Sequence, residues 1–115
     1  MGGCAACLAL FMILALSYSL IGVYLPRSWY LLNVQTLQDE VGDLDRVDQV
    51  VKLFGIVNSA DTFQEQHLVM NGCSDAIVDA LGKDVAFHAR SAIGTNALPL
   101  GAAVEVEAIV RVLRD

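Results

Sequence analysis

The sequence predicts an α/β protein in which helices pack on one face of a sheet. The first observation behind this is the order of elements after residue 30, which reads helix, strand, helix, strand, strand. Such an order is typical of one helical layer against a sheet. The second observation is a C-terminal segment in which every second residue is apolar, from Val104 to Val112, as in a half-buried strand. At 115 residues the chain forms one domain at most.

Each predicted element has a local signal. A helix is expected from Leu31 to Val41, with apolar residues on one face and Gly42 after its end. The apolar, β-branched run from Val47 to Val57 predicts a buried strand. Thr62 and Glu65 have capping-box spacing. We therefore expect a second helix from Thr62 to Leu81, with Ser74 on its water-facing side.

The last part of the chain predicts two strands joined by a turn. The strands run from Val85 to Thr95 and from Ala103 to Leu113, and the turn contains Pro99 and Gly101. In the last strand, Glu105 and Glu107 share one face with Arg111, and the opposite face is entirely apolar. The apolar face is expected to join the core.

Composition argues against several classes of function. The net charge is −6 and the pI is about 4.6, and the basic residues are scattered, whereas nucleic-acid-binding proteins usually carry a basic patch. Cys4 and Cys7 form a single CxxC without a second pair, so neither a metal site nor a redox motif is indicated. Cys73 is expected to be a small buried hydrophobe. The sequence contains no nucleotide-binding glycine motif, and we expect no cofactor and no metal.

Four residues could carry chemistry. Arg90 stands in an apolar strand, and its guanidinium could hold a carboxylate through two parallel hydrogen bonds or form a structural ion pair. Glu105 could orient water and move a proton, or lie on a solvated sheet surface. Asn71 could hydrogen-bond the strand that carries Arg90, or be an exposed helical residue. His88 has the same strand parity as Arg90 and could line a pocket with it.

Several segments resemble the RidA family, also called YjgF or L-PSP endoribonuclease-like. The C-terminal segment carries the most specific part of the resemblance, in Ala89-Arg90-Ser91, Leu98-Pro99 and residues 104–109. Gly42 to Val47, Val50 to Asn58 and Val69 to Gly72 resemble earlier parts of the family in the right order. The resemblance implies a chorismate-mutase-like fold, a homotrimer and active sites in the clefts between subunits.

The resemblance also implies a reaction. Family members hydrolyse enamine or imine intermediates to 2-oxo acids and ammonia without a cofactor. By resemblance, Arg90 would bind the substrate carboxylate and Glu105 would position the attacking water. Glu107 also matches a family position, but we assign it to structural pairing with Arg111 across a subunit boundary. Many members have a cysteine where this chain has Ala92, so thiolate chemistry is absent at that position. The alternatives are a non-catalytic ligand-binding or interaction protein, and an endoribonuclease or translation inhibitor.

Residues 1–30 do not fit the family, which normally begins with a β-hairpin. Cys4 to Leu25 carries no charge, and a run of this length can cross a bilayer as a helix. Three interpretations remain open: a membrane anchor, a wrongly assigned start that replaces the hairpin, and a buried core helix. We therefore expect a hydrophobic N-terminal helix in residues 1–30 and a RidA-like domain, truncated at its start, in residues 31–115. The expected location is the cytoplasm, or the membrane surface if residues 4–25 form an anchor.

Overall fold

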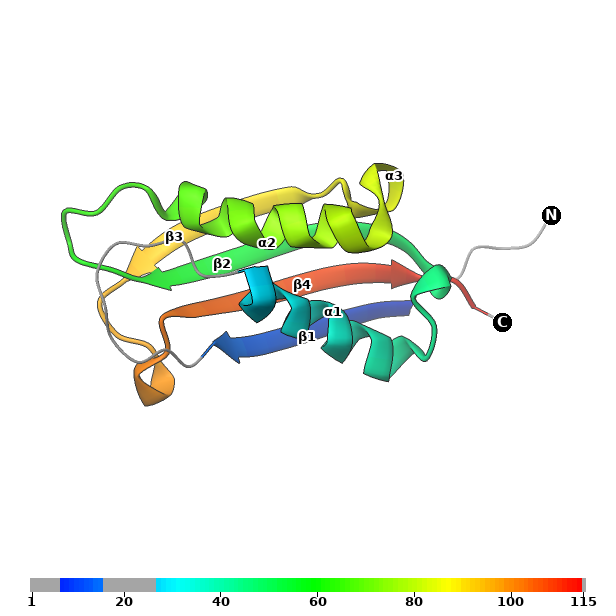
Figure 1. Ribbon diagram of the computed structural model, residues 1–115. Coiled ribbons are helices and arrows are strands. Elements are labelled where there is room, and N and C mark those ends of the chain that lie inside the picture. Colours follow the sequence, from blue (N-terminus) through cyan, green and yellow to red (C-terminus); the bar gives the residue numbers. More distant parts are fainter. Residues whose placement is uncertain (1–6, 16–26, 115) are drawn as a thin grey trace.

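A four-stranded sheet forms the centre of the molecule. The computed structural model describes residues 7–15 and 27–114, with side chains from residue 34 onward. The strand order is β1-β4-β2-β3, in which β4 is antiparallel to both of its neighbours and β2 is parallel to β3 (Figure 1). The strands are β1 (Cys7–Ala15), β2 (Val47–Asn58), β3 (Ala89–Thr95) and β4 (Val104–Val112).

Two helices cover one face of this sheet, as the sequence predicts. They are α1 (Arg27–Val41) and α2 (Gln66–Leu81), and both lie on the same side of the strands in Figure 1. A single helical turn, α3 (Lys83–Ala86), links α2 to β3, and two 3₁₀ turns lie at Leu44–Arg46 and Pro99–Gly101. The mixed α+β architecture is therefore confirmed.

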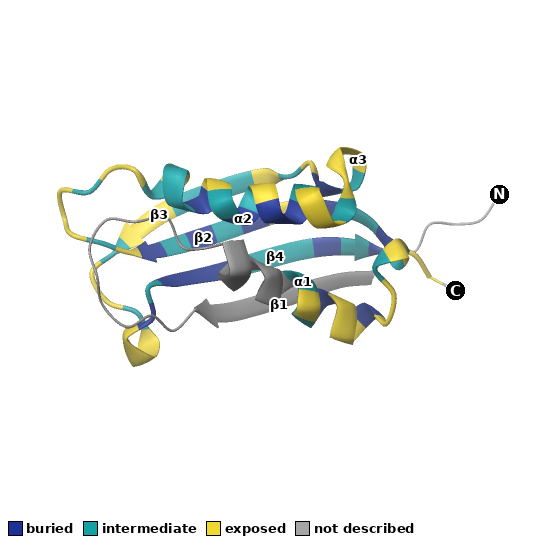
Figure 2. Cartoon of the chain, viewed as in Figure 1, coloured by how far each residue is buried: buried dark blue, intermediate teal, exposed yellow. Residues whose placement is uncertain are grey.

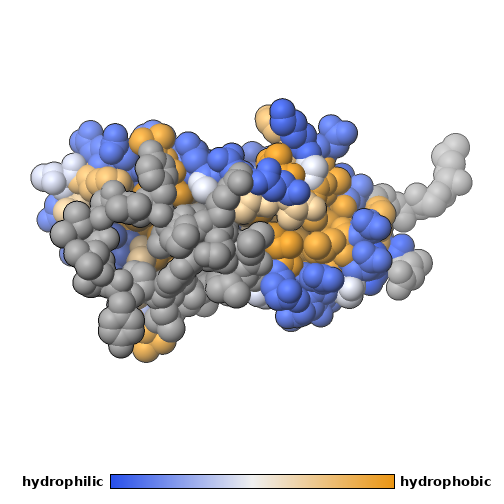
Figure 3. Space-filling model, in the orientation of Figure 1, coloured by the Kyte–Doolittle hydropathy of each residue, from blue (hydrophilic) through white to orange (hydrophobic). Residues whose placement is uncertain are grey.

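The core lies between the sheet and the two helices, and Figure 2 shows buried positions along α2, β2 and β4. The larger cluster joins α2 to β2 and β4 through residues such as Leu53, Met70 and Val104. The smaller cluster joins α1 to the ends of β2 and β4 through Leu37 and Val110. On the helix side, polar side chains border an apolar strip between α2 and the C-terminal half of α1 (Figure 3). The predicted apolar face of β4 is thus confirmed as core.

A close approach between β2 and α2 depends on Gly55. A Cβ atom at this position would lie 2.6 Å from Cγ and Cε of Met70, and closer still to its sulfur. Met70 is fully buried, so its side chain has little free space to move into. The missing side chain of Gly55 therefore determines how deeply α2 sits on the sheet.

The expectation of an N-terminal apolar helix is wrong for the described residues of that segment. Cys7–Ala15 is a strand that pairs with β4 from Cys7 opposite Val112 to Ala15 opposite Val104. This pairing satisfies the backbone groups of β1 that point toward β4, whereas an isolated apolar segment would have to satisfy its backbone groups within itself as a helix. The rest of the expected membrane segment, residues 4–6 and 16–25, lies outside the described residues. Among the described helices, none is long and apolar enough to cross a bilayer.

Two predicted boundaries also change. The helix α2 begins at Gln66 rather than Thr62, and the side chain of Glu65 at its N-cap makes no capping hydrogen bond. The side-chain amide of Gln66 donates to Phe63 O at 2.8 Å in the turn before the helix. The strand β3 begins at Ala89 rather than Val85. Before Ala89, the side-chain amide of Gln49 donates to the carbonyls of Val85 and Phe87. These hydrogen bonds hold Val85 to Phe87 as a turn that does not pair with the sheet.

Candidate functional site

Arg90 lies on the helix-facing side of β3. Its register partner on β2 is Leu53, which is fully buried beneath α2. The guanidinium of Arg90 is held by two acceptors on α2: Nη1 donates to Ser74 Oγ at 3.0 Å and Nη2 to His67 O at 3.2 Å. Both acceptors are neutral, and no ion pair joins Arg90 to a carboxylate among the described residues. The half-buried positive charge can therefore accept an external anion.

His88 joins the same cluster through Ser74. Its Nε2 lies 3.0 Å from Ser74 Oγ, and its Nδ1 contacts the carbonyl oxygen of Ala86. The structure thus brings His88 and Arg90 to one side of β3, as their strand parity indicates. Their common partner, Ser74, is half-buried rather than water-facing, which corrects the expectation for that residue.

Asn71 stands on the same side of α2 by helical spacing. His67, Asn71 and Ser74 are separated by four and three residues, which places them in one row along a helix. Asn71 is exposed, and its side chain makes no hydrogen bond with any described residue. The expected hydrogen bond from Asn71 to β3 is absent, so its amide is free to contact a ligand bound at Arg90.

Glu105 lies on the opposite face of the sheet. Its register partner on β2 is Ile56, whereas the register partner of Arg90 is Leu53, three residues away. Residues an odd number apart in a strand point to opposite faces. Glu105 is only 9% exposed, so it does not lie on a freely solvated sheet surface, which was the alternative to a role in catalysis. Within one protomer the structure does not bring Arg90 and Glu105 together.

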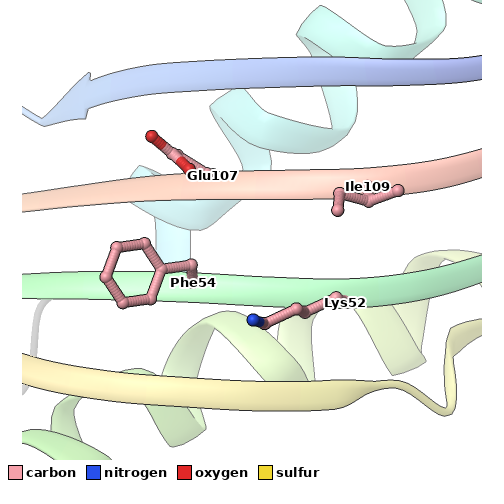
Figure 4. Close-up of a pocket in the computed structure, with 4 residues that line it drawn as sticks. All are labelled: Lys52, Phe54, Glu107 and Ile109. Atoms are coloured by element: carbon pink, nitrogen blue, oxygen red, sulfur yellow. The ribbon is translucent and has the colours of Figure 1, made fainter.

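A shallow hollow lies on this open face of the sheet. The hollow has a volume of about 180 Å³. It is lined by Lys52 and Phe54 from β2 and by Glu107 and Ile109 from β4 (Figure 4). Arg111, the predicted partner of Glu107, instead forms an ion pair with Asp48 on β2 in the same protomer. The pairing expected across a subunit boundary stays a prediction.

Cys73 faces the core from α2, as predicted, and is fully buried. Desolvation by burial raises the pKa of its thiol to about 12, against a smaller lowering effect of the nearby Arg90 charge. A thiol with this pKa is almost entirely protonated at neutral pH and is a poor nucleophile. Among the residues with described side chains, no group of three or more His, Cys, Asp or Glu could hold a metal ion.

The comparison with known sequences gives one informative relative. No family model matches the chain. Protein TCP17 of Trypanosoma cruzi is 51% identical over 84 residues, which make up 73% of this chain and 52% of the relative. The chain therefore spans about half the length of the curated relative it matches.

Solved structures identify the fold. The protein Atu1372 of Agrobacterium tumefaciens, whose function is unknown, has a TM-score of 0.70 at 39% identity over 75% of this chain and 56% of that one. An Entamoeba histolytica protein described as "a putative endoribonuclease L-PSP" has a TM-score of 0.50 at 28% identity, over 75% of this chain and 60% of that one. The chain has the RidA-family fold. The family resemblance that the C-terminal segment predicts is thereby confirmed at the level of the fold.

The RidA-family fold places the candidate residues in two groups. Arg90, Ser74 and His88 lie between α2 and β3, and Asn71 lies in the same row of α2 as Ser74. Glu105 and Glu107 lie on the open face of the sheet. Sequence reasoning missed Ser74, although its spacing from His67 and Asn71 could have indicated it. It also missed the hollow beside Lys52, whose signal was the alternation of Lys52, Phe54 and Ile56 along β2.

Proposed function

We propose that this RidA-fold protein hydrolyses small imines or enamines that carry a carboxylate, releasing ammonia and a 2-oxo acid. The observation that carries the proposal is the guanidinium of Arg90, which is half-buried and which, among the described residues, is held by neutral acceptors. Two of its five N–H groups are used by these described partners, which leaves three for a ligand. A carboxylate offers two oxygens that match such a planar donor.

Hydrolysis of an imine requires that the substrate is bound, that water is oriented and that protons are transferred. An imine carbon is electrophilic, so attack by water requires no cofactor. Arg90 would hold the carboxylate of the substrate, the amide of Asn71 could contact the same ligand, and Glu105 would position the attacking water. A carboxylate can accept a hydrogen bond from water and so orient it for attack.

The opposite orientation of Arg90 and Glu105 has a consequence for assembly. A site that uses both residues must take them from two protomers, because one sheet separates them within a protomer. We therefore propose a homotrimer in which Glu105 of one copy meets Arg90 of the next. The open face of the sheet, with its half-buried Phe54 and Ile56 and its exposed Ile93, would lie toward the neighbouring copies.

The direct test compares Arg90→Lys and Arg90→Ala with the wild type in an assay of ammonia release from an amino-acid-derived imine. Both variants should lose most of the activity, because a single ammonium cannot reproduce a planar pair of donors. Loss of one charge-assisted hydrogen bond is worth about 1.5–3 kcal/mol, or roughly 10- to 150-fold in affinity.

The matched control for this test is Arg111→Lys. Arg111 is another half-buried strand arginine, but it pairs with Asp48 on the opposite face, so the variant should hydrolyse the imine at the wild-type rate. Full activity in Arg90→Lys would rule out carboxylate binding by the guanidinium. Tight binding of a 2-oxo acid by a wild type without turnover would favour the alternative of a non-catalytic ligand-binding protein.

An endoribonuclease is the weaker alternative. The name of the Entamoeba relative suggests it, but a net charge of −6 opposes binding to a phosphate backbone. Salt-dependent binding of RNA by the wild type would support this function over imine hydrolysis.

A further inference from the structure

Hydrogen bonds link His88, Ser74 and Arg90 in a row, and the donor of each bond can be assigned. The Nδ1 atom of His88 contacts the carbonyl oxygen of Ala86, and a carbonyl can only accept, so Nδ1 carries the hydrogen. In the neutral ring Nε2 is then a bare acceptor. The 3.0 Å contact of Nε2 with Ser74 Oγ is therefore a hydrogen bond that the serine hydroxyl donates.

Arg90 fixes the other side of the same hydroxyl. Its Nη1 donates to Ser74 Oγ at 3.0 Å, so Oγ accepts from a cation while its own hydrogen is directed at an imidazole. A cationic donor stabilises negative charge that develops on Oγ, and the imidazole is a base placed to take its proton. A hydroxyl, an adjacent base and a group that orients the base make up the usual arrangement for proton transfer in enzymes.

The three hydrogen-bonded residues lie on the other side of the sheet from Glu105. His88, Ser74 and Arg90 all lie between α2 and β3 on the helix side, and all three are half-buried rather than sealed. Glu105 lies on the other face of the sheet. Hydrolysis of an imine needs a proton removed from water and a proton delivered to nitrogen, and the helix side of one protomer holds a pair that could perform both transfers.

We propose that Ser74 and His88 form the proton-transfer pair of the Arg90 site and move a proton from the attacking water to the leaving nitrogen. This inference rests on the proposed function and adds two residues to it. Water adds to the carbon of the protonated imine as the C=N π electrons move to nitrogen. The water proton passes to Ser74 Oγ while the serine hydrogen passes to His88 Nε2, which leaves a neutral carbinolamine and an imidazolium.

The second half of the reaction returns the proton. The imidazolium gives it back through Ser74 to the amino nitrogen, which becomes an ammonium leaving group. The C–N bond then breaks as the oxygen lone pair forms the C=O bond, and the hydroxyl proton leaves with the nitrogen as NH₄⁺. The 2-oxo acid remains on Arg90, and the Ser74–His88 pair is back in its starting state.

The kinetic test uses Ser74→Ala, Ser74→Thr and His88→Gln. His88→Gln keeps a polar group near Nε2 but removes the base, so we expect kcat to fall about 10²- to 10⁴-fold, with less than about threefold change in the Kd of a stable 2-oxo acid. Ser74→Thr keeps the hydroxyl and should restore most of the activity lost in Ser74→Ala. Since the two residues act in series, Ser74→Ala/His88→Gln should be no slower than the slower single variant.

The control is Ser91→Ala, because Ser91 is a half-buried serine next to Arg90 in β3 that belongs to the opposite face and should leave kcat unchanged. A His88→Gln enzyme with wild-type kcat would overturn the inference while leaving the proposed function intact. A wild type without any turnover above that of Arg90→Ala would overturn both.

A second measurement is independent of activity. Nitrogen-15 NMR of the imidazole in the wild-type protein should show neutral His88 protonated at Nδ1 and bare at Nε2. Neutral His88 protonated at Nε2 would mean that the histidine donates to Ser74, and would overturn the inference whatever the kinetics show.

Discussion

Substitution of Gly55 by alanine tests whether the contact between β2 and α2 determines the stability of the fold and the geometry of the site. The new methyl group would lie 2.6 Å from two carbon atoms of Met70, although ordinary carbon contacts lie near 3.5–4.0 Å. The Met70 side chain must therefore move by about 1 Å or more. Because Met70, Leu53 and Cys73 are all fully buried, this displacement is transmitted to α2.

The expected magnitude follows from two opposing effects. Overpacking of a filled core costs about 1–3 kcal/mol, and the absence of free space around Met70 favours the upper half of that range. Replacing glycine by alanine in the unfolded chain returns about 0.5–1 kcal/mol. The net loss should be about 1–2.5 kcal/mol, or a fall in Tm of roughly 4–10 °C for a domain of this size.

The assay is urea unfolding of Gly55→Ala, Met70→Ala and the double variant. Met70→Ala alone should lose about 2–5 kcal/mol through its cavity. The double variant should be more stable than the sum of the single losses by about 1–3 kcal/mol, because the new methyl group partly fills that cavity. Strict additivity, or a Gly55→Ala protein as stable as the wild type, would refute the close-contact argument.

Three further predictions concern the site, the assembly and the core. Glu105→Gln should lower imine turnover by about 10²- to 10⁴-fold while leaving the affinity for a 2-oxo acid nearly unchanged. Steady-state kinetics measures the turnover, and calorimetric titration measures the affinity. A collapse in affinity would contradict a role in positioning water. Sedimentation equilibrium should show a homotrimer, and a stable monomer at micromolar concentration would count against a shared site. The pKa of the Cys73 thiol is raised by burial from its ordinary value of 9.0 to about 12, so the contribution of the neutral thiol to stability is complete below pH 9 and is lost as the pH rises from 9 through about 12. Urea unfolding at pH 8 and pH 10.5 should show a larger loss for the wild type than for Cys73→Ala, and equal losses would refute this assignment.

Much of the fold follows from local patterns. The alternation from Val104 to Val112 predicts both the strand and its buried face, and Gly42 and Gly82 mark the ends of α1 and α2 where φ is +80°. The apolar, β-branched run that begins at Val47 predicts β2, because residues of this type favour a buried strand. These signals are local, so they need no knowledge of partners.

The features that the sequence does not predict depend on contacts distant in the chain. The apolar run of residues 7–15 is compatible with a helix or a strand, and only pairing with β4 decides between them. The start of β3 depends on the side chain of Gln49, nearly forty residues earlier in the chain. The opposite orientation of Arg90 and Glu105 requires the register of three strands, which residue spacing within any one strand cannot supply.

The position of β4 in the sheet has a consequence for synthesis in the cell. β4 is the last of the four strands to leave the ribosome, yet it lies between β1 and β2. Until it emerges, β1 has no neighbour in the sheet and β2 has an unpaired edge on one side, and exposed strand edges favour association with other chains. The nascent protein therefore depends on β4 for protection from aggregation, and a chain cut short before Val104 could not complete the sheet described here.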